Sequence, residues 1–87
     1  MTGLPNISLR PIYLIAEEIK KDWKNVYFGA IPYLEALLTL STINSNYGAD
    51  SAETIILYFL SNATGYRGEK AKACKKELKA HLKSYVK

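Results

Sequence analysis

The stretch Asp22-Trp23-Lys24-Asn25-Val26-Tyr27-Phe28-Gly29-Ala30-Ile31-Pro32-Tyr33-Leu34 (residues 22–34) decides how this chain folds. It holds the only tryptophan, one of the two phenylalanines and two of the seven tyrosines. Gly29 and Pro32 prevent one uninterrupted helix, because glycine is a poor helix former and proline lacks the backbone N–H. We therefore expect an aromatic hinge between two helices. Its rings are expected first to fill the core and second to form a partner-binding surface: Trp23, Tyr27, Phe28 and Tyr33.

Helices are predicted on both sides of this hinge. Apolar residues recur at helical spacing from Ile12 to Trp23, which predicts a first helix over residues 9–24 with Ser8 as its N-cap. Pro32 suits the first turn of a second helix, predicted over 31–43. The segment after it is rich in turn-forming residues and is expected to be a loop.

Two further helices are predicted in the second half of the chain. Asp50 and Glu53 read as a capping box for a helix over 51–62, which is apolar nearly all round and is therefore expected at the centre of the bundle. Thr64 is the predicted N-cap of a last helix over 65–85. Its expected core stripe is Ala71, Cys74, Leu78, Leu82 and Tyr85. No alternating pattern predicts a strand.

The fold class that follows is a single all-α bundle of about four helices, with residues 1–7 as a flexible arm and 8–87 as one domain. The chain has 87 residues, 48% of them hydrophobic, which suffices for one small core.

Cys74 is the only cysteine, so neither a disulfide within the chain nor a Cys-rich metal site is expected. We expect no cofactor. The absence of a signal-peptide pattern and of a long apolar run predicts a cytoplasmic protein that does not enter a membrane.

Basic charge is gathered near the C-terminus. Residues 1–63 carry four basic and six acidic side chains, whereas residues 64–87 carry eight basic and two acidic ones. Five lysines fall on one side of the predicted last helix. Together with an arginine they are the candidate anion-binding residues: Arg67, Lys72, Lys75, Lys76, Lys79 and Lys83. The alternative is a solvated helix face, on which lysine is simply a good helix former.

Arg67 projects on the core side of the predicted last helix, apart from the lysines. Two interpretations remain open for it: an internal ion pair with an acidic residue (Asp22, Glu35 or Asp50), or an anion clamp. Tyr66 beside it can stack on a base or pack in the core. The polar residues of the hinge, together with two tyrosines, form a candidate partner-binding rim: Asp22, Lys24, Asn25, Tyr27 and Tyr66.

The spacing of the reactive residues in this chain does not suit catalysis. Cys74 and His81 are the only thiol–imidazole pair, and their spacing on a helix separates them by about 10 Å along the axis, beyond hydrogen-bonding reach. A cysteine on an apolar stripe is expected to be a core residue. The pattern Gly65-x-x-Gly68 lacks the preceding strand that a phosphate-binding loop requires. We therefore expect a protein that is not an enzyme and binds no metal.

Five short motifs run through the middle of the chain. They are Asp22-Trp23-Lys24, Val26-Tyr27-Phe28-Gly29-Ala30, Pro32-Tyr33-Leu34-Glu35-Ala36, Tyr47-Gly48-Ala49-Asp50-Ser51 and Arg67-Gly68-Glu69. Together they resemble a family of small proteins encoded by bacteriophages and prophages, over roughly residues 15–82. Tyr66 stands where that family is associated with tryptophan, which keeps an aromatic side chain. The resemblance implies a viral origin and action inside a bacterial cell, and it transfers no catalytic or binding residues.

Two functional hypotheses follow. The first is a non-enzymatic accessory protein that binds another macromolecule, an inhibitor or adaptor of a host or phage protein. The second is an anion binder, for nucleic acid or a nucleotide, that uses Arg67 and the basic C-terminal helix. The lysines predict weak, salt-sensitive and non-specific binding, because lysine contacts to phosphate carry no sequence information. Either hypothesis is compatible with a homo-oligomer.

Overall fold

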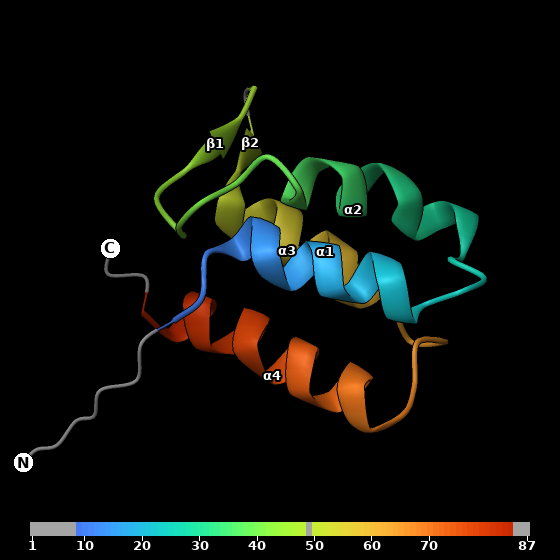
Figure 1. Ribbon diagram of the computed structural model, residues 1–87. Helices are drawn as coiled ribbons and strands as arrows, with labels where there is room; N and C mark the ends of the chain where they lie inside the picture. Colours follow the sequence, from blue (N-terminus) through green and yellow to red (C-terminus); the bar gives the residue numbers. More distant parts are fainter. Residues whose placement is uncertain (1–8, 49, 85–87) are drawn as a thin grey trace, which may run out of the picture.

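Four helices pack around one apolar core in the computed structural model, which describes residues 9–48 and 50–84 (Figure 1). In chain order the elements are α1 (Ile12–Asp22), the 3-10 turn η1 (Phe28–Ala30), α2 (Ile31–Leu37), β1 (Asn46–Tyr47), β2 (Asp50–Ser51), α3 (Ala52–Ser61) and α4 (Glu69–Lys83). The predicted all-α bundle of four helices is confirmed. The predicted flexible arm, residues 1–7, lies outside the described residues.

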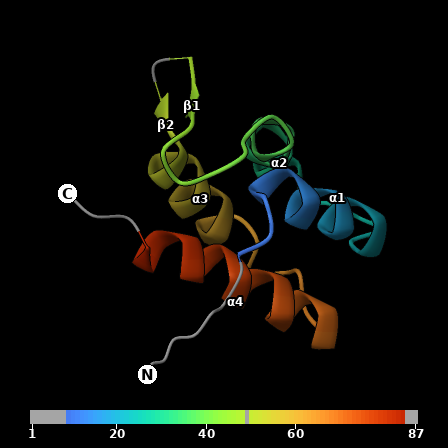
Figure 2. The same cartoon turned by 60° about the vertical axis from the view of Figure 1, so that its left-hand side comes forward.

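The helices are arranged so that α1 and α3 each pack against both α2 and α4 (Figure 1). Figure 2 shows the same bundle from a second side, with α4 crossing beneath the other three helices. The core comes from all four helices. Its largest fully buried side chains include Ile12, Ile15 and Ile19 of α1, Leu37 of α2, Ile56 and Phe59 of α3, and Leu78 of α4.

The first helix begins later than predicted. α1 starts at Ile12, with Pro11 as its N-cap, so the predicted start at Leu9 is wrong. The proposed cap Ser8 lies outside the described residues. Within the described residues, no side chain makes a capping hydrogen bond to α1. Instead, the backbone N–H groups of Ile12 and Tyr13 donate to the carbonyl groups of Ser41 and Leu40, at 2.9 Å each. The loop after α2 thus satisfies donors that a side chain was expected to satisfy.

The other helix boundaries also differ from the prediction. α2 ends at Leu37 rather than near residue 43. Ser51, not Asp50, is the N-cap of α3, and its Oγ accepts a hydrogen bond from the backbone N–H of Thr54 at 3.2 Å. α4 begins at Glu69 after Gly68, so Thr64 does not cap it. The predicted core residue Tyr85 lies outside the described residues.

A short antiparallel hairpin was not predicted. β1 and β2 pair with Asn46 opposite Ser51 and Tyr47 opposite Asp50. Gly48, in the turn between them, has a φ of +61°, a conformation that suits glycine. Two-residue strands are too short to show an alternating pattern, which is why the sequence contains no signal for them.

The third helix is not fully enclosed. Its buried side chains lie on one face (Ala52, Ile55, Ile56 and Phe59), whereas Leu57 and Tyr58 are about half exposed, at 47% and 52%. The prediction of a helix at the centre of the bundle is therefore wrong. α3 is one of four helices in a ring, and its apolar outer face is open.

Candidate functional site

Trp23 and Tyr66 form the buried half of the aromatic hinge. Their rings stack with centroids 5.0 Å apart, and Trp23 also meets Phe59 edge-on at 6.3 Å. The hydroxyl of Tyr66 donates to Asp22 Oδ2 at 2.8 Å. Burial, aided by this hydrogen bond, raises the pKa of Tyr66 above its usual range. Tyr66 is only 2% exposed, so its assignment to a partner-binding rim, or to stacking on a base, is wrong.

Tyr27 and Phe28 form the exposed half of the hinge. Tyr27 is 49% exposed and Phe28 is 76% exposed, and their rings lie 4.9 Å apart. The expectation that both fill the core is therefore wrong, whereas it is confirmed for Trp23, and Tyr33 packs partly buried against the core. Gly29 makes the arrangement possible: a Cβ there would lie 2.5 Å from the Tyr27 ring. Tyr27 folds over the space that a side chain would occupy.

A second pair of aromatic rings lies on α2 and α3. Tyr33 and Tyr58 lie 5.4 Å apart between ring centroids. Asn62 lies between the two pairs: its Nδ2 donates to the carbonyl of Tyr58 at 2.9 Å, and its Oδ1 lies beside Gly29, next to which the Tyr27 ring also packs. We call these four rings, Tyr27, Phe28, Tyr33 and Tyr58, the aromatic surface. Tyr33 was predicted to fill the core first and to form a partner-binding surface second. Tyr58 was not among the predicted site residues, since nothing in the helical spacing separated it from core positions.

A hollow of about 390 Å³ opens beside Tyr27. It is lined by Tyr27, Ser61, Asn62, Thr64 and Gly65, from η1's N-cap, the end of α3 and the loop that follows. The hydroxyl of Ser61 donates to the carbonyl of Leu57 at 3.0 Å. The wall is therefore one aromatic ring and a set of short polar side chains, more polar than the predominantly apolar lining of most small-ligand pockets.

The predicted row of lysines is present on α4. We call these five residues the lysine face: Lys72, Lys75, Lys76, Lys79 and Lys83. Lys72, Lys76, Lys79 and Lys83 are exposed, and Lys76, Lys79 and Lys83 border a shallow hollow of about 230 Å³. Lys75 differs, because it is partly buried and its Nζ donates to the carbonyl of Tyr66 at 2.7 Å. Burial lowers the pKa of Lys75, and the positive charges of Lys79 and Arg67 lower it further.

Arg67 lies with the lysines and not with the core. It is exposed, in the loop before α4, and within the described residues it makes no ion pair with Asp22, Glu35 or Asp50. The predicted core-side position is wrong because α4 starts at Glu69, two residues after Arg67. The helical spacing used for the prediction therefore does not apply to Arg67. The structure thereby brings Arg67 close enough to Lys75 to affect its pKa.

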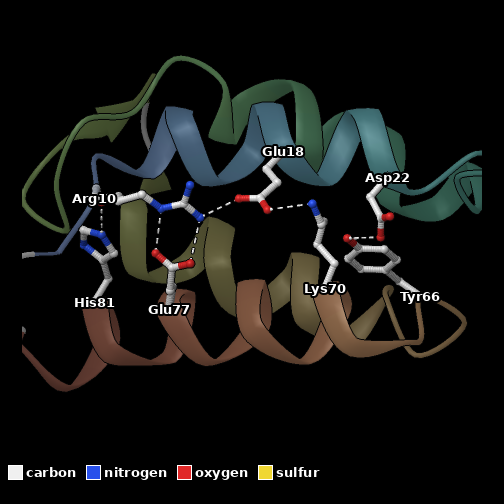
Figure 3. A network of polar contacts seen from close by, with 7 residues as sticks. All are labelled: Arg10, Glu18, Asp22, Tyr66, Lys70, Glu77 and His81. Carbon is white, nitrogen blue, oxygen red and sulfur yellow. Dashed lines mark hydrogen bonds and ion pairs between the residues drawn. The ribbon is translucent and has the colours of Figure 1, made fainter.

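The internal ion pair of this fold belongs to a different arginine. Arg10 donates through Nε and Nη2 to both carboxylate oxygens of Glu77, at 2.8 and 2.7 Å, and its Nη2 also lies 2.8 Å from Glu18 (Figure 3). Lys70 completes the group at 3.3 Å from the other oxygen of Glu18. No spacing rule predicts this contact, since Arg10 precedes α1 and Glu77 lies in α4.

The other predicted rim residues stay at the surface. Lys24 and Asn25 are exposed between α1 and η1, and Asp22 is exposed but is hydrogen-bonded to Tyr66. The predicted rim residues therefore differ in their accessibility. Lys24, Asn25 and Tyr27 are accessible, Asp22 is used within the fold, and Tyr66 is covered.

Cys74 is a buried core residue, as predicted. His81 is also buried, and its Nε2 lies 2.7 Å from the carbonyl oxygen of Arg10 (Figure 3). A hollow of about 380 Å³ between Tyr13 and His81 borders Leu9 and Ser84, beyond which the chain is not described, and we assign it no ligand.

Residues 9–48 and 50–84 contain no group of three or more His, Cys, Asp or Glu side chains placed to share a metal ion. Over the same residues, no helix has the length and apolar character needed to cross a membrane.

Comparisons of this chain with family models, with curated proteins and with solved structures gave no significant match.

Proposed function

We propose that this chain is a non-enzymatic binding protein that docks on another protein through the aromatic surface. The observation that carries the proposal is the exposure of Tyr27 and Phe28, 49% and 76%, in a domain small enough to need every large apolar side chain in its core. Exposed aromatic clusters mark interaction sites, and tyrosine is among the residues that supply most binding energy at interfaces.

The setting that we propose is the cytoplasm of a bacterial host, with the chain acting as a phage-type inhibitor or adaptor of a host or phage protein. The phage-like motifs around residues 22–36 and 47–51 support this setting. Those motifs include Tyr27, Phe28 and Tyr33 of the aromatic surface. A second copy of the chain is a further partner compatible with an apolar surface of this kind.

A tagged-protein capture from bacterial lysate tests the proposal. We expect one stoichiometric partner that stays bound at high salt, because apolar contacts are not screened. Phe28→Ser should abolish the capture, because it removes an aromatic ring from the proposed docking surface. The fold should stay intact, because the Phe28 side chain is exposed. Tyr13→Ser is the matched control, because Tyr13 is 37% exposed on α1, outside the aromatic surface. Equal capture by the two variants, or no partner at all, would contradict the proposal.

Anion binding by the lysine face is a second candidate function. It is favoured by the position of Arg67 and Lys79 near Lys75: burial lowers the pKa of Lys75, and repulsion from the positive charges of Lys79 and Arg67 lowers it further. Such repulsion is relieved when an anion binds. If the four exposed lysines and Arg67 contact phosphates, affinity for duplex DNA should fall with salt on a log–log slope of roughly −4 to −5. No binding at low salt would exclude this candidate.

A further inference from the structure

One loop connects the hollow beside Tyr27 to Lys75 of the lysine face. Gly65 lines the hollow, and the next residue, Tyr66, receives the ammonium group of Lys75 on its carbonyl oxygen at 2.7 Å. Arg67 follows directly and acts on the pKa of Lys75. In the sequence, Arg67 therefore follows Gly65, which lines the hollow with Tyr27, by only two residues of one loop.

The wall of the hollow is suited to a flat heterocycle. Tyr27 offers a half-exposed ring whose position is held by Gly29 and Asn62. Ser61, Asn62 and Thr64 add hydroxyl and amide groups at its edge. Because Ser61 Oγ already donates to a carbonyl group of α3, its oxygen atom is left as an acceptor for an N–H group of a base.

We propose that this hollow receives a base of single-stranded nucleic acid, stacked on Tyr27, while the neighbouring phosphates lie on Arg67 and the lysine face. The inference rests on the second candidate function and names its ligand class. Aromatic rings that stack bases, combined with a basic track for the backbone, are how proteins bind single strands without sequence preference.

A single strand fits these features better than a duplex or a protein. The faces of a base in a duplex are covered by its neighbours, so Tyr27 has no free ring to stack on. A protein anchor would need an apolar pocket, whereas Tyr27 is the only aromatic or aliphatic side chain that lines this hollow. Arg67, exposed two residues after Gly65, is placed to meet a phosphate next to an inserted base.

Binding of labelled oligodeoxythymidylate, and of a duplex of equal length, measured by fluorescence anisotropy tests the inference. Tyr27→Leu should weaken single-strand binding by about 5- to 150-fold, the range for one lost base–aromatic stack, and leave duplex binding unchanged. Tyr27→Phe keeps the ring and should keep the affinity. Tyr13→Leu is the control for an exposed tyrosine elsewhere.

Gly65→Leu provides a second route that does not depend on Tyr27. A Cβ at Gly65 meets no atom within 4 Å and its φ is not positive, so a new side chain at this lining position of the hollow should not strain the fold. We expect the same selective loss of single-strand binding. Lys79→Gln, in contrast, should weaken both ligands and reduce the salt slope by about 1.

The outcomes separate the inference from the function on which it rests. Single-strand binding that is lost in Lys79→Gln but unchanged in Tyr27→Leu and Gly65→Leu overturns the base pocket and leaves phosphate binding standing. No binding of either nucleic acid at low salt overturns both. Equal weakening of single-strand and duplex binding by Tyr27→Leu also overturns the base pocket, because stacking on Tyr27 requires a free base.

Discussion

Arg10 and Glu77 form a two-pronged ion pair across 67 positions of sequence, with both nitrogen–oxygen distances below 2.9 Å (Figure 3). The pair ties the segment before α1 to the middle of α4. Glu18 of α1 shares the same guanidinium, and Lys70 of α4 shares Glu18. Because α1 and α4 are thereby linked at several points, this polar group fixes their register next to the apolar core.

Replacing Arg10 should weaken the fold modestly. Arg10→Lys keeps a charge but cannot match both oxygens of Glu77, and we expect a loss of about 0.5–1 kcal/mol in the free energy of unfolding, since the side chains are 34–40% exposed and solvent screens the pair. Urea unfolding at low and high salt measures it, with Lys20→Gln as a control at an exposed position of α1. An unchanged midpoint in Arg10→Lys would show that the fork geometry is unimportant.

Acid should unfold the chain partly through Glu18. The hydrogen bond from Arg10, with a smaller contribution from Lys70, lowers the pKa of Glu18 below its usual range. A lowered folded-state pKa stabilises the protein above the unfolded value of about 4.3, and this stability is lost as pH falls through the folded pKa. Glu18→Gln should therefore lower stability at pH 7 and lose less on acidification, as followed by urea midpoints between neutral and acid pH.

Glu17→Gln is the matched control for this experiment. Glu17 precedes Glu18 on α1 and is exposed, and none of the ion pairs in the described part of the chain includes it. Its substitution should leave the pH dependence nearly as in the unaltered chain. If both variants flatten the acid limb equally, overall charge and not the Arg10 contact is responsible.

Removing the hydroxyl of Tyr66 should cost about 1 kcal/mol of stability, because a part-buried hydrogen bond to Asp22 is lost while the ring stays. The effect also has a pH signature. The raised pKa of Tyr66 means that its contribution is present below about pH 10 and is lost as pH rises further. Tyr66→Phe should therefore unfold less steeply than the unaltered chain in alkali. Intrinsic fluorescence of Trp23, which stacks on this ring, reports the transition.

Replacement by alanine is expected to affect two glycines to different extents. Gly68 has a φ of +114°, a conformation costly for other residues, so Gly68→Ala should destabilise the start of α4 by about 1–3 kcal/mol. Gly65 has open space around it and no positive φ, so Gly65→Ala should change stability by less than about 0.5 kcal/mol. Thermal unfolding of both variants compares them directly. Equal losses would show that the backbone at Gly68 relaxes.

Gly29→Ala should disturb the aromatic surface more than the core. The added Cβ would lie 2.5 Å from Cε2 of Tyr27 and 2.9 Å from Oδ1 of Asn62. Because Tyr27 is half exposed, its ring can swing into solvent, so we expect a small stability loss and a large change in the NMR signals of Tyr27 and Asn62. Unchanged signals would contradict the packing of Tyr27 on Gly29.

Local pattern predicted much of this fold. The spacing of Ile12, Ile15, Ile19 and Trp23 marked the buried face of α1, and the same reasoning found Ala71, Cys74 and Leu78 on α4. Helix boundaries were predicted less well, because backbone partners remote in sequence decided them. The N–H groups of α1 bond to carbonyls of the loop after α2, and no cap residue marks that start.

The candidate site was anticipated only in part. The lysine face followed from helical periodicity, since exposed residues on a helix repeat as regularly as buried ones. Tyr27 and Tyr66 have the same chemistry and both flank polar residues, so no local signal distinguished them. Packing did: Tyr66 lies between Trp23 and Lys75, whereas Tyr27 is folded back over Gly29 towards the surface.

The amino-acid order alone thus settles which segments become helices, which of their faces are apolar and where positive charge gathers, because these depend on residues within a few turns of one another. The closed bundle decides which aromatic rings are covered, which arginine forms the internal ion pair and which lies with the lysines. Those outcomes depend on the contact of Arg10 with Glu77 and of Trp23 with Tyr66, pairs that only the folded chain brings together.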